Sequence, residues 1–194
     1  MTKKHAVKEA VVAFRDAAEF EAWLEVNVEL AEGVWLKVAK KSSGIRSLTS
    51  DEAVDIGLCF GWISGQRKLL DNVYYLQKYV PRRRLSSWSQ VNVAKVAELV
   101  ATGRMRASGL AEVDAAKADG RWAAAYESQR NATVPPDLAV ALRASAQAAQ
   151  AFDGLNKTQQ YAVILKLSTA RTVTGRETQL RRVVAALAGP AIGD

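Results

Sequence analysis

The sequence predicts an α+β fold, with a small, mostly antiparallel sheet, flanking helices and a C-terminal three-helix unit. Residues 34–40 alternate as a strand does, and two later runs rich in aromatic and β-branched residues flank an Asp-Asn pair. From residue 136 onward the apolar residues recur only at helical spacing. We therefore expect two domains, an α+β domain at residues 1–130 and a helical domain at residues 131–194.

The first helix and the first strand follow from the spacing of apolar residues. In residues 16–33, Phe20, Trp23 and other apolar side chains recur at roughly helical intervals, with acidic side chains on the opposite face. This pattern predicts an amphipathic helix that ends at Gly33. In "VWLKVAK" at 34–40, Val, Leu and Val point to one side while Trp, Lys and Ala point to the other, which predicts a strand.

A buried helix and a hairpin are predicted next. Thr49 and Glu52 have the spacing of a capping box, which predicts a helix start. The helix continues through "AVDIGLCF" and is expected to stop at Gly61. The runs "WISGQRKLL" and "VYYLQKYV" flank "DN", so we expect them to form an antiparallel pair.

The rest of the chain is predicted to be helical. One helix ends at Gly103 and the next at Gly120. The first of these two is expected to bury a single face, made of Val93, Val96, Ala97 and Val100. Three C-terminal helices follow: "PDLAVALRASAQAAQAFDGL", a helix that starts near Asn156, and a helix capped by Thr174 and Glu177.

Composition narrows the possible classes of protein. Cys59 is the single cysteine and His5 the single histidine, so one chain assembles neither a disulfide nor a Cys/His zinc site. We predict no metal and no cofactor. No apolar run approaches the ~18 residues that span a bilayer, and the N-terminus lacks the uninterrupted apolar core of a secretory signal, so we expect a cytoplasmic protein. The net charge of +7 favours phosphate-rich or acidic partners.

The segment "PRRRLSSWSQVN" at residues 81–92 is the strongest candidate for a binding surface. Arginine forks bind phosphate or carboxylate and stack on indole, and the serines and the asparagine lie at the predicted entry to a helix. In the structural alternative, a serine or the asparagine caps that helix, the tryptophan packs in the core and the arginines are solvated or paired. The candidate residues here are Arg82, Arg83, Ser86, Trp88, Ser89 and Asn92.

A second group of candidates lies on the neighbouring strands. Trp62, Ser64 and Gln66 alternate, so they share one face if the strand is regular, and this face either lines a ligand cleft or is covered by another element. Lys40 and Lys41 end the first strand and either add positive potential to the same edge or are solvated loop lysines.

Several motifs together resemble a known family. "EAVDIGLCFGWISGQ", "YVPRRRLSSWSQVN", "AKADGRW" and "TARTVTGRETQLRR" occur in the order typical of the YdeI/OmpD-associated bacteriocin-protection family. The resemblance implies a cytoplasmic bacterial protein with an α+β N-terminal region and a helical C-terminal domain, associated with tolerance of bacteriocins or cationic antimicrobial peptides. Ser64 stands where that family usually has Asp, so an acid-base role at this position is not expected.

Three functions follow from these observations. We favour a non-enzymatic, cytoplasmic stress or bacteriocin-tolerance factor, whose Arg/Trp-lined cleft holds an anionic small molecule or an acidic protein surface. The alternative is a nucleic-acid-binding protein, in which aromatic rings stack on bases and guanidinium groups contact phosphates. The third is an enzyme acting on a phosphorylated or carboxylated small molecule, with Ser64, Ser86, Asp71 and Tyr74 as polar participants.

Overall fold

The computed structural model describes residues 10–170 and 172–189. Within these residues the chain packs as two compact units. The first unit contains the residues up to Ser86 and then Asn92–Gly120, and the second contains Ser87–Val91 and the residues from Arg121 onward. The chain therefore enters the second unit briefly, returns to the first and then completes the second. The domain boundary expected at residue 130 stays a prediction.

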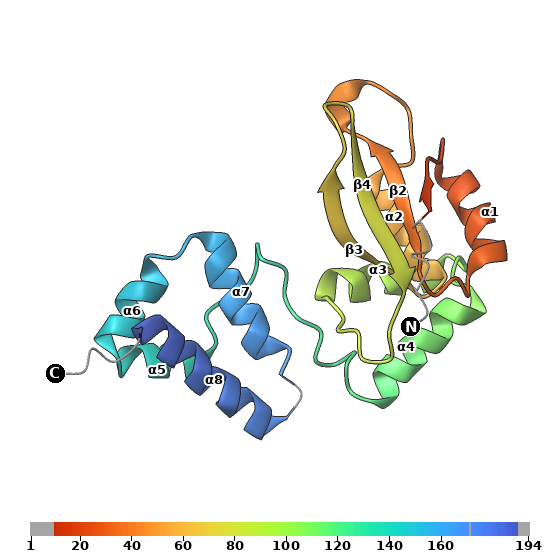
Figure 1. Cartoon of the computed structure of the whole chain (residues 1–194). Helices are drawn as coiled ribbons and strands as arrows, with labels where there is room; N and C mark the ends of the chain where they lie inside the picture. Colours follow the sequence, from red (N-terminus) through yellow and green to blue (C-terminus); the bar gives the residue numbers. More distant parts are fainter. Residues whose placement is uncertain (1–9, 171, 190–194) are drawn as a thin grey trace, which may run out of the picture. The chain divides into compact units, whose positions relative to one another are not determined.

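In the described residues, the first unit is built on a four-stranded sheet with the order β1-β2-β4-β3 (Figure 1). Strand β4 pairs antiparallel with both β2 and β3, while β1 pairs parallel with β2. The predicted sheet and its β3–β4 hairpin are thus confirmed. The strands are β1 (Val11–Val12), β2 (Val34–Ala39), β3 (Trp62–Leu69) and β4 (Tyr74–Pro81).

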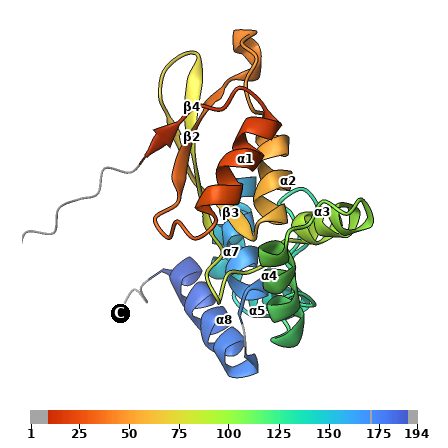
Figure 2. The same cartoon turned by 90° about the vertical axis from the view of Figure 1, so that its right-hand side faces the viewer.

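Helices α1 (Ala17–Asn27) and α2 (Ser50–Cys59) cover one face of the sheet, which Figure 2 shows from its edge. Asp16 caps α1 by accepting a hydrogen bond from the Glu19 N–H at 3.0 Å. The predicted continuation of this helix to Gly33 is wrong. The Asn27 side chain donates to the Trp23 carbonyl at 2.8 Å, and the chain then turns, with Gly33 at a φ of 64° just before β2.

An aromatic cluster joins α1 to the sheet. The ring centroid of Phe20 lies 5.8 Å from that of Tyr79 on β4, and Trp23 packs edge-on against Trp62 on β3 at 6.1 Å. The indole N–H of Trp62 donates to the Val28 carbonyl at 3.0 Å. Aromatic pairs with these geometries each contribute about 0.5–1.5 kcal/mol beyond area burial, so this cluster fixes α1 on the sheet.

Helices α3 (Gln90–Ala101) and α4 (Ala107–Ala118) complete the first unit, α3 from Asn92 onward. The predicted buried face of α3 is only partly right, because Val96 and Leu99 are buried while Ala97 and Val100 are exposed. The buried face is therefore the i, i+3 pair Val96 and Leu99, and Leu99 was not part of the predicted face.

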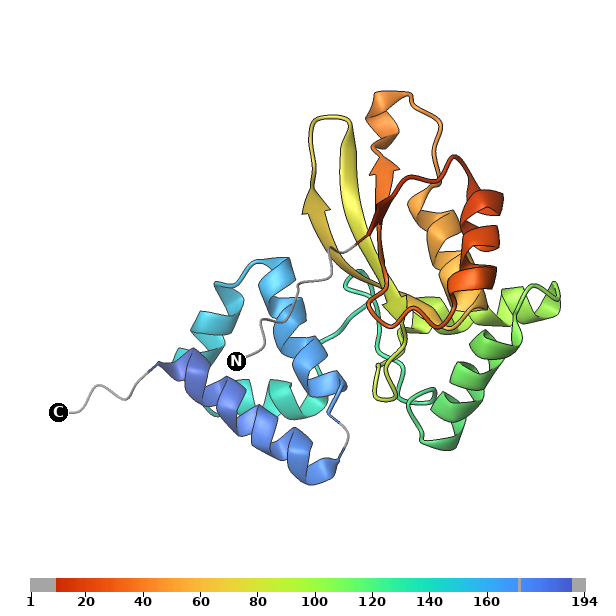
Figure 3. The same ribbon diagram turned by 45° about the vertical axis from the view of Figure 1, so that its right-hand side comes forward.

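Helix α4 lies close to the C-terminal end of α2 (Figure 3). At the crossing, Gly109 of α4 approaches the Cys59 carbonyl of α2 so closely that a Cβ atom at this position would overlap it. Burial in this region raises the pKa of the Cys59 thiol. The cysteine therefore behaves as a small apolar side chain rather than as a nucleophile.

In the described residues, the second unit contains four helices instead of the predicted three: α5 (Pro136–Arg143), α6 (Ala146–Asp153), α7 (Lys157–Ser168) and α8 (Val173–Ala188). The predicted first helix is interrupted at Ser145, whose hydroxyl caps α6 by accepting from the Ala148 N–H. Helix α7 starts next to Asn156 as expected, and Asn156 forms a capping box with Gln159. The cap of α8 is Thr172 rather than the predicted Thr174.

The four helices share one hydrophobic core. Helix α8 contacts each of the other three helices, so its apolar side chains close the core. The buried members are Leu138, Leu142, Ala148, Phe152, Leu167 and Val183.

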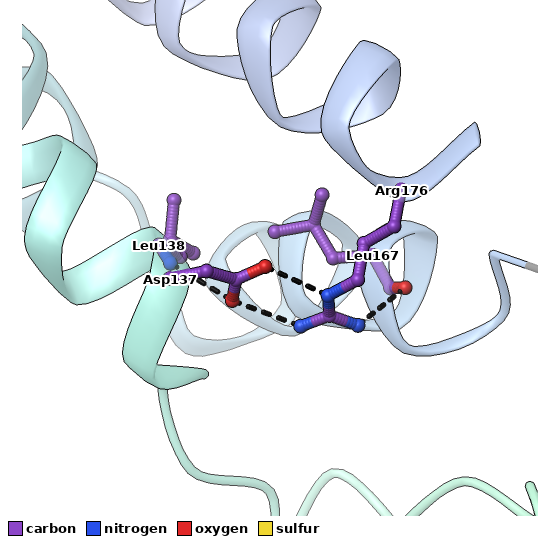
Figure 4. A network of polar contacts seen from close by, with 4 residues as sticks. All are labelled: Asp137, Leu138, Leu167 and Arg176. Atoms are coloured by element: carbon purple, nitrogen blue, oxygen red, sulfur yellow. Dashed lines mark hydrogen bonds and ion pairs between the residues drawn. The ribbon is translucent and has the colours of Figure 1, made fainter. Parts of the chain in front are cut away.

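An ion pair joins α5 and α8 (Figure 4). The Arg176 guanidinium donates to both Asp137 carboxylate oxygens, at 2.7 and 2.9 Å, and to the Leu167 carbonyl of α7 at 2.8 Å. One arginine thus ties three helices together. These hydrogen bonds hold the pKa of Asp137 below its usual value and raise the pKa of Arg176.

We expect Arg176→Gln to lower the free energy of unfolding of the second unit by about 1–2 kcal/mol at pH 7, because the pair is about one-third exposed and solvent screens it. The depressed pKa of Asp137 stabilises the folded state above the carboxyl's ordinary pKa of about 4, and this contribution disappears as pH falls through the lower folded-state value. Urea unfolding at pH 7 and at pH 3 should show a smaller wild-type advantage at pH 3 than at pH 7. An equal advantage at both values would contradict the assignment.

Candidate functional site

A pocket of about 1040 Å³ lies in the first unit, between the β2–α2 connection and the β3–β4 hairpin. Figure 3 shows that this connection and the turn of the hairpin lie at the same end of the sheet. We call it the basic pocket. Its walls are formed by residues 38–41 and 44–51 together with Arg67, Leu69 and Tyr75.

The lining of the basic pocket is strongly cationic. Arg67 lies on the strand side, and Lys40, Lys41 and Arg46 lie on the connection, whereas Asp51 is the one acidic residue among the lining residues that the structure describes. A concave surface with this excess of positive charge concentrates anions, because low-dielectric walls reduce the screening that water provides.

A β-bulge directs Arg67 into the pocket. Ser64 lies opposite Tyr79 in the hairpin, but Arg67 lies opposite Gln77, so the register shifts by one residue between them. Directly opposite residues share a face of the sheet. The shift therefore places Arg67 on the same face as Tyr79, which is the face that α1 and α2 pack against. In an unbroken strand Gln66 would take this place.

Gln77 holds both the bulge and the arginine. Its side chain is 7% exposed, and its amide N–H groups donate to the carbonyls of Gly65 and Gln66 at 2.9 and 3.2 Å. Its Oε1 accepts from the Arg67 Nε at 2.8 Å. The one buried amide of Gln77 thus supplies a hydrogen-bond partner to each of the two carbonyls that the bulge removes from the strand ladder. It also holds the Arg67 guanidinium in place.

The remaining contacts of Arg67 fix the plane of its guanidinium group. Its Cζ lies 4.4 Å from the ring centroid of Tyr75, a cation–π arrangement, and its Nη2 lies 3.4 Å from the hydroxyl of Ser50 at the start of α2. Gln77 accepts from Nε and Ser50 accepts from one N–H of Nη2, so Nη1 and the second N–H of Nη2 are left to meet a ligand. These donors match the two oxygens of a carboxylate or phosphate.

Hydrogen bonds from Lys40 hold the connection from β2 to α2 against the β3–β4 turn. The Lys40 ammonium donates to the Asp71 carbonyl at 2.7 Å and its backbone N–H to the Val73 carbonyl at 2.8 Å. A short 3-10 helix, Lys41–Ser43, follows and ends at Gly44, whose φ of 68° favours glycine. The charge of Lys40 is therefore held at a fixed position by a backbone carbonyl.

Helix α2 begins at the pocket. The Thr49 hydroxyl accepts from the Glu52 N–H at 3.2 Å, and the Glu52 carboxylate accepts from the Thr49 N–H at 2.9 Å, which confirms the predicted capping box. The hydrogen bond from the Thr49 backbone is the main reason that the pKa of Glu52 is lowered. Glu52 is thus engaged in the cap, and it is Thr49, Ser50 and Asp51 that line the pocket.

Two of the residues predicted for a site, Lys40 and Lys41, line the basic pocket. Trp62 instead lies in the aromatic core of the first unit, and Ser64 is exposed beside it on β3. The condition for Trp62, Ser64 and Gln66 to share a face was a regular strand, and the bulge breaks it at Gln66. Ligand binding by these three residues stays a prediction.

The arginine segment is divided between the units. Arg82, Arg83 and Ser86 belong to the first unit, where the Arg82 side chain is buried and the Ser86 hydroxyl accepts from the Arg83 N–H at 3.0 Å. Asn92 lies in the first turn of α3. Binding by this group also stays a prediction.

Trp88 and Ser89 belong to the second unit. Trp88 is buried, with its ring centroid 4.9 Å from that of Trp122, and its carbonyl accepts from the Tyr126 N–H at 3.0 Å. Ser89 forms a parallel bridge with Tyr126. In the second unit, Trp88 and Ser89 therefore pack against Trp122 and Tyr126 as part of the fold.

Sequence reasoning missed the pocket residues Arg46, Arg67, Ser50 and Tyr75. One signal pointed to Arg67, because an isolated glycine inside a strand pattern, here Gly65, is typical of a bulge. The others come together only when the β2–α2 connection folds beside the hairpin.

Within residues 10–170 and 172–189, no cluster of three or more His, Cys, Asp or Glu side chains has an arrangement that could hold a metal ion. Among the helices of the same residues, none combines the length and the apolar character needed to cross a membrane.

Two family models match the chain. One, described as a domain of unknown function (DUF8412), matches residues 12–112, just over half of the chain. The other, described as bacteriocin-protection, YdeI or OmpD-associated, matches residues 131–189 and confirms the resemblance drawn from the sequence. That second span contains the four helices of the second unit. Comparison with curated proteins and with solved structures gave no match.

Proposed function

The chain belongs to the family described as a domain of unknown function (DUF8412) and carries a domain of the bacteriocin-protection, YdeI or OmpD-associated family; from this we propose that it has a bacteriocin-protection-type role. It performs this role in the cytoplasm, as a non-enzymatic protein that binds an anionic ligand in the basic pocket.

The observation that carries the proposal is the fixed position of Arg67. Its guanidinium is held by Gln77 and stacked on Tyr75 before any ligand arrives, so little side-chain entropy is lost on binding. Lys40, Lys41 and Arg46 add positive charge on the facing wall.

Binding is favoured over catalysis by the residue types in the pocket. Its described lining includes neither histidine nor cysteine, the side chains that most readily transfer protons or attack a substrate near neutral pH. Of its hydroxyls, Ser47 accepts from the Ala39 N–H and Thr49 forms the cap of α2. These hydroxyls are thus used in holding the walls.

We expect the double variant Arg46→Ala, Arg67→Ala to bind inorganic pyrophosphate at least tenfold more weakly than the wild type. Each charge-assisted hydrogen bond contributes about 1.5–3 kcal/mol, and 1.4 kcal/mol corresponds to a factor of ten. Isothermal titration calorimetry at low salt measures this change. Arg104→Ala is the matched control, because Arg104 is exposed in the same unit and does not line the pocket.

The cellular role is tested with the same variants in a strain that lacks its own copy of the gene. The wild-type and Arg104→Ala proteins should restore survival under bacteriocin challenge, and the double variant should not. Equal protection by all three would refute the proposed use of the pocket. Steeply salt-dependent binding of DNA or RNA, lost in the double variant, would instead favour the nucleic-acid alternative.

A further inference from the structure

We infer that the ligand of the basic pocket is an amphipathic anion, with one carboxylate or phosphate head and an apolar body. This inference rests on the proposed binding role of the pocket and specifies its ligand class. The head pairs with Arg67, and the apolar body lies along the side chains next to it.

The size of the pocket exceeds the needs of an inorganic anion. Its volume of about 1040 Å³ lies just above the range of roughly 300–1,000 Å³ that is typical of small-molecule pockets. One water molecule occupies about 30 Å³ of liquid, and a free phosphate is only a few times larger. A ligand that uses this pocket therefore has a body well beyond its charged group.

An apolar wall begins directly beside Arg67. In the hairpin register Leu69 lies opposite Tyr75, and Tyr75 lies opposite Val38 on β2. These three side chains form a row across β3, β4 and β2 on the same face as Arg67, because residues two apart on a strand share a face. All three line the pocket.

The facing wall is also apolar over part of its length. Leu48 is buried at the pocket and Ile45 is 48% exposed, while Leu69 across from them is 76% exposed. Two large apolar side chains left in contact with water at one concave site are typical of a surface that a ligand covers. The positive charges at Lys40, Lys41 and Arg46 surround this apolar surface rather than replace it.

The shape of the charged edge selects the head group. Gln77 accepts from Nε of Arg67 and Ser50 from one N–H of Nη2, so a ligand meets Nη1 and the second N–H of Nη2, which donate to the oxygens of a carboxylate or phosphate. A phosphate head on a membrane lipid and a soluble amphiphile share this chemistry, and the experiment separates these two sources.

The test compares three probes by calorimetry at low salt: octyl phosphate below its micelle concentration, inorganic phosphate and octanol. We expect octyl phosphate to bind at least tenfold more tightly than inorganic phosphate, and octanol to bind more weakly than octyl phosphate. Leu69→Ser should remove most of the octyl advantage, while Arg67→Ala should weaken the binding of both phosphates.

Val26→Ser is the matched control, because Val26 is 82% exposed on α1 and does not line the pocket. Equal affinity for octyl phosphate and inorganic phosphate would overturn this inference and leave the anion-binding role intact. No binding of either phosphate would overturn both. Binding to vesicles that contain phosphatidylglycerol, lost in Leu69→Ser and Arg67→Ala, would assign the head to a membrane lipid; binding of octyl phosphate without vesicle binding would assign it to a soluble amphiphile.

Discussion

Replacing Gly109 by alanine is expected to lower the free energy of unfolding of the first unit by about 3 kcal/mol. A Cβ atom at this position would overlap the Cys59 carbonyl and lie 2.8 Å from the Leu58 carbonyl, so α2 and α4 would have to separate. The gain of up to about 1 kcal/mol in helix propensity is too small to offset this overlap. Urea unfolding followed by tryptophan fluorescence measures the change.

Gly154→Ala is the control, because a Cβ there meets its nearest described neighbour at 3.5 Å, an ordinary contact. This variant should change stability by less than about 1 kcal/mol. If Gly109→Ala proved as stable as the wild type, the close crossing of α2 and α4 would be wrong. The expected effect is large because both overlapping groups are backbone, which side-chain rotation does not relieve.

Gln77→Leu is expected to have the second largest effect and to link stability with binding. The substitution leaves two bulge carbonyls and the Arg67 Nε without the partner that Gln77 provides, which costs about 2–3 kcal/mol of stability. It also frees Arg67 to rotate, so pyrophosphate affinity should fall roughly tenfold even where the protein is fully folded. Unfolding and calorimetry on the same sample measure both changes.

Gln66→Leu provides the comparison, because Gln66 is exposed and neighbours Gln77 across the bulge. It should leave stability within about 0.5 kcal/mol of the wild type, and pyrophosphate affinity unchanged. A Gln77→Leu protein that kept full affinity would show that Arg67 is not positioned by this amide.

The parts of the fold that the sequence predicted well are those set by local chemistry. The hairpin, the capping box at Thr49, the helix start at Asn156 and the helix stops at Gly61 and Gly103 depend on a few neighbouring residues. The break at Ser145 was missed because the residues around it all favour helix, and the packing of two shorter helices around Phe152 overrides that preference.

The candidate site was harder to predict because it depends on tertiary structure. Lys40 and Lys41 could be found as charges at the end of a strand, but Arg67 faces the pocket only through the bulge. The tryptophans that suggested a ligand surface, Trp62 and Trp88, are both buried, each within its own unit. The burial of these two aromatic side chains depends on tertiary packing, which the sequence pattern alone did not reveal.

The bulge in β3 has one more consequence, for the way the protein meets other copies of itself. In the described residues β3 is an edge strand of the sheet. A long, regular edge strand has unpaired backbone groups that can pair with another copy and lead to aggregation. The bulge between Ser64 and Arg67 interrupts the regular edge, and the charges of Arg67 and Lys68 follow it directly, so pairing with another copy is disfavoured. The same inserted residue therefore sets the position of Arg67 and interrupts the edge strand of the sheet.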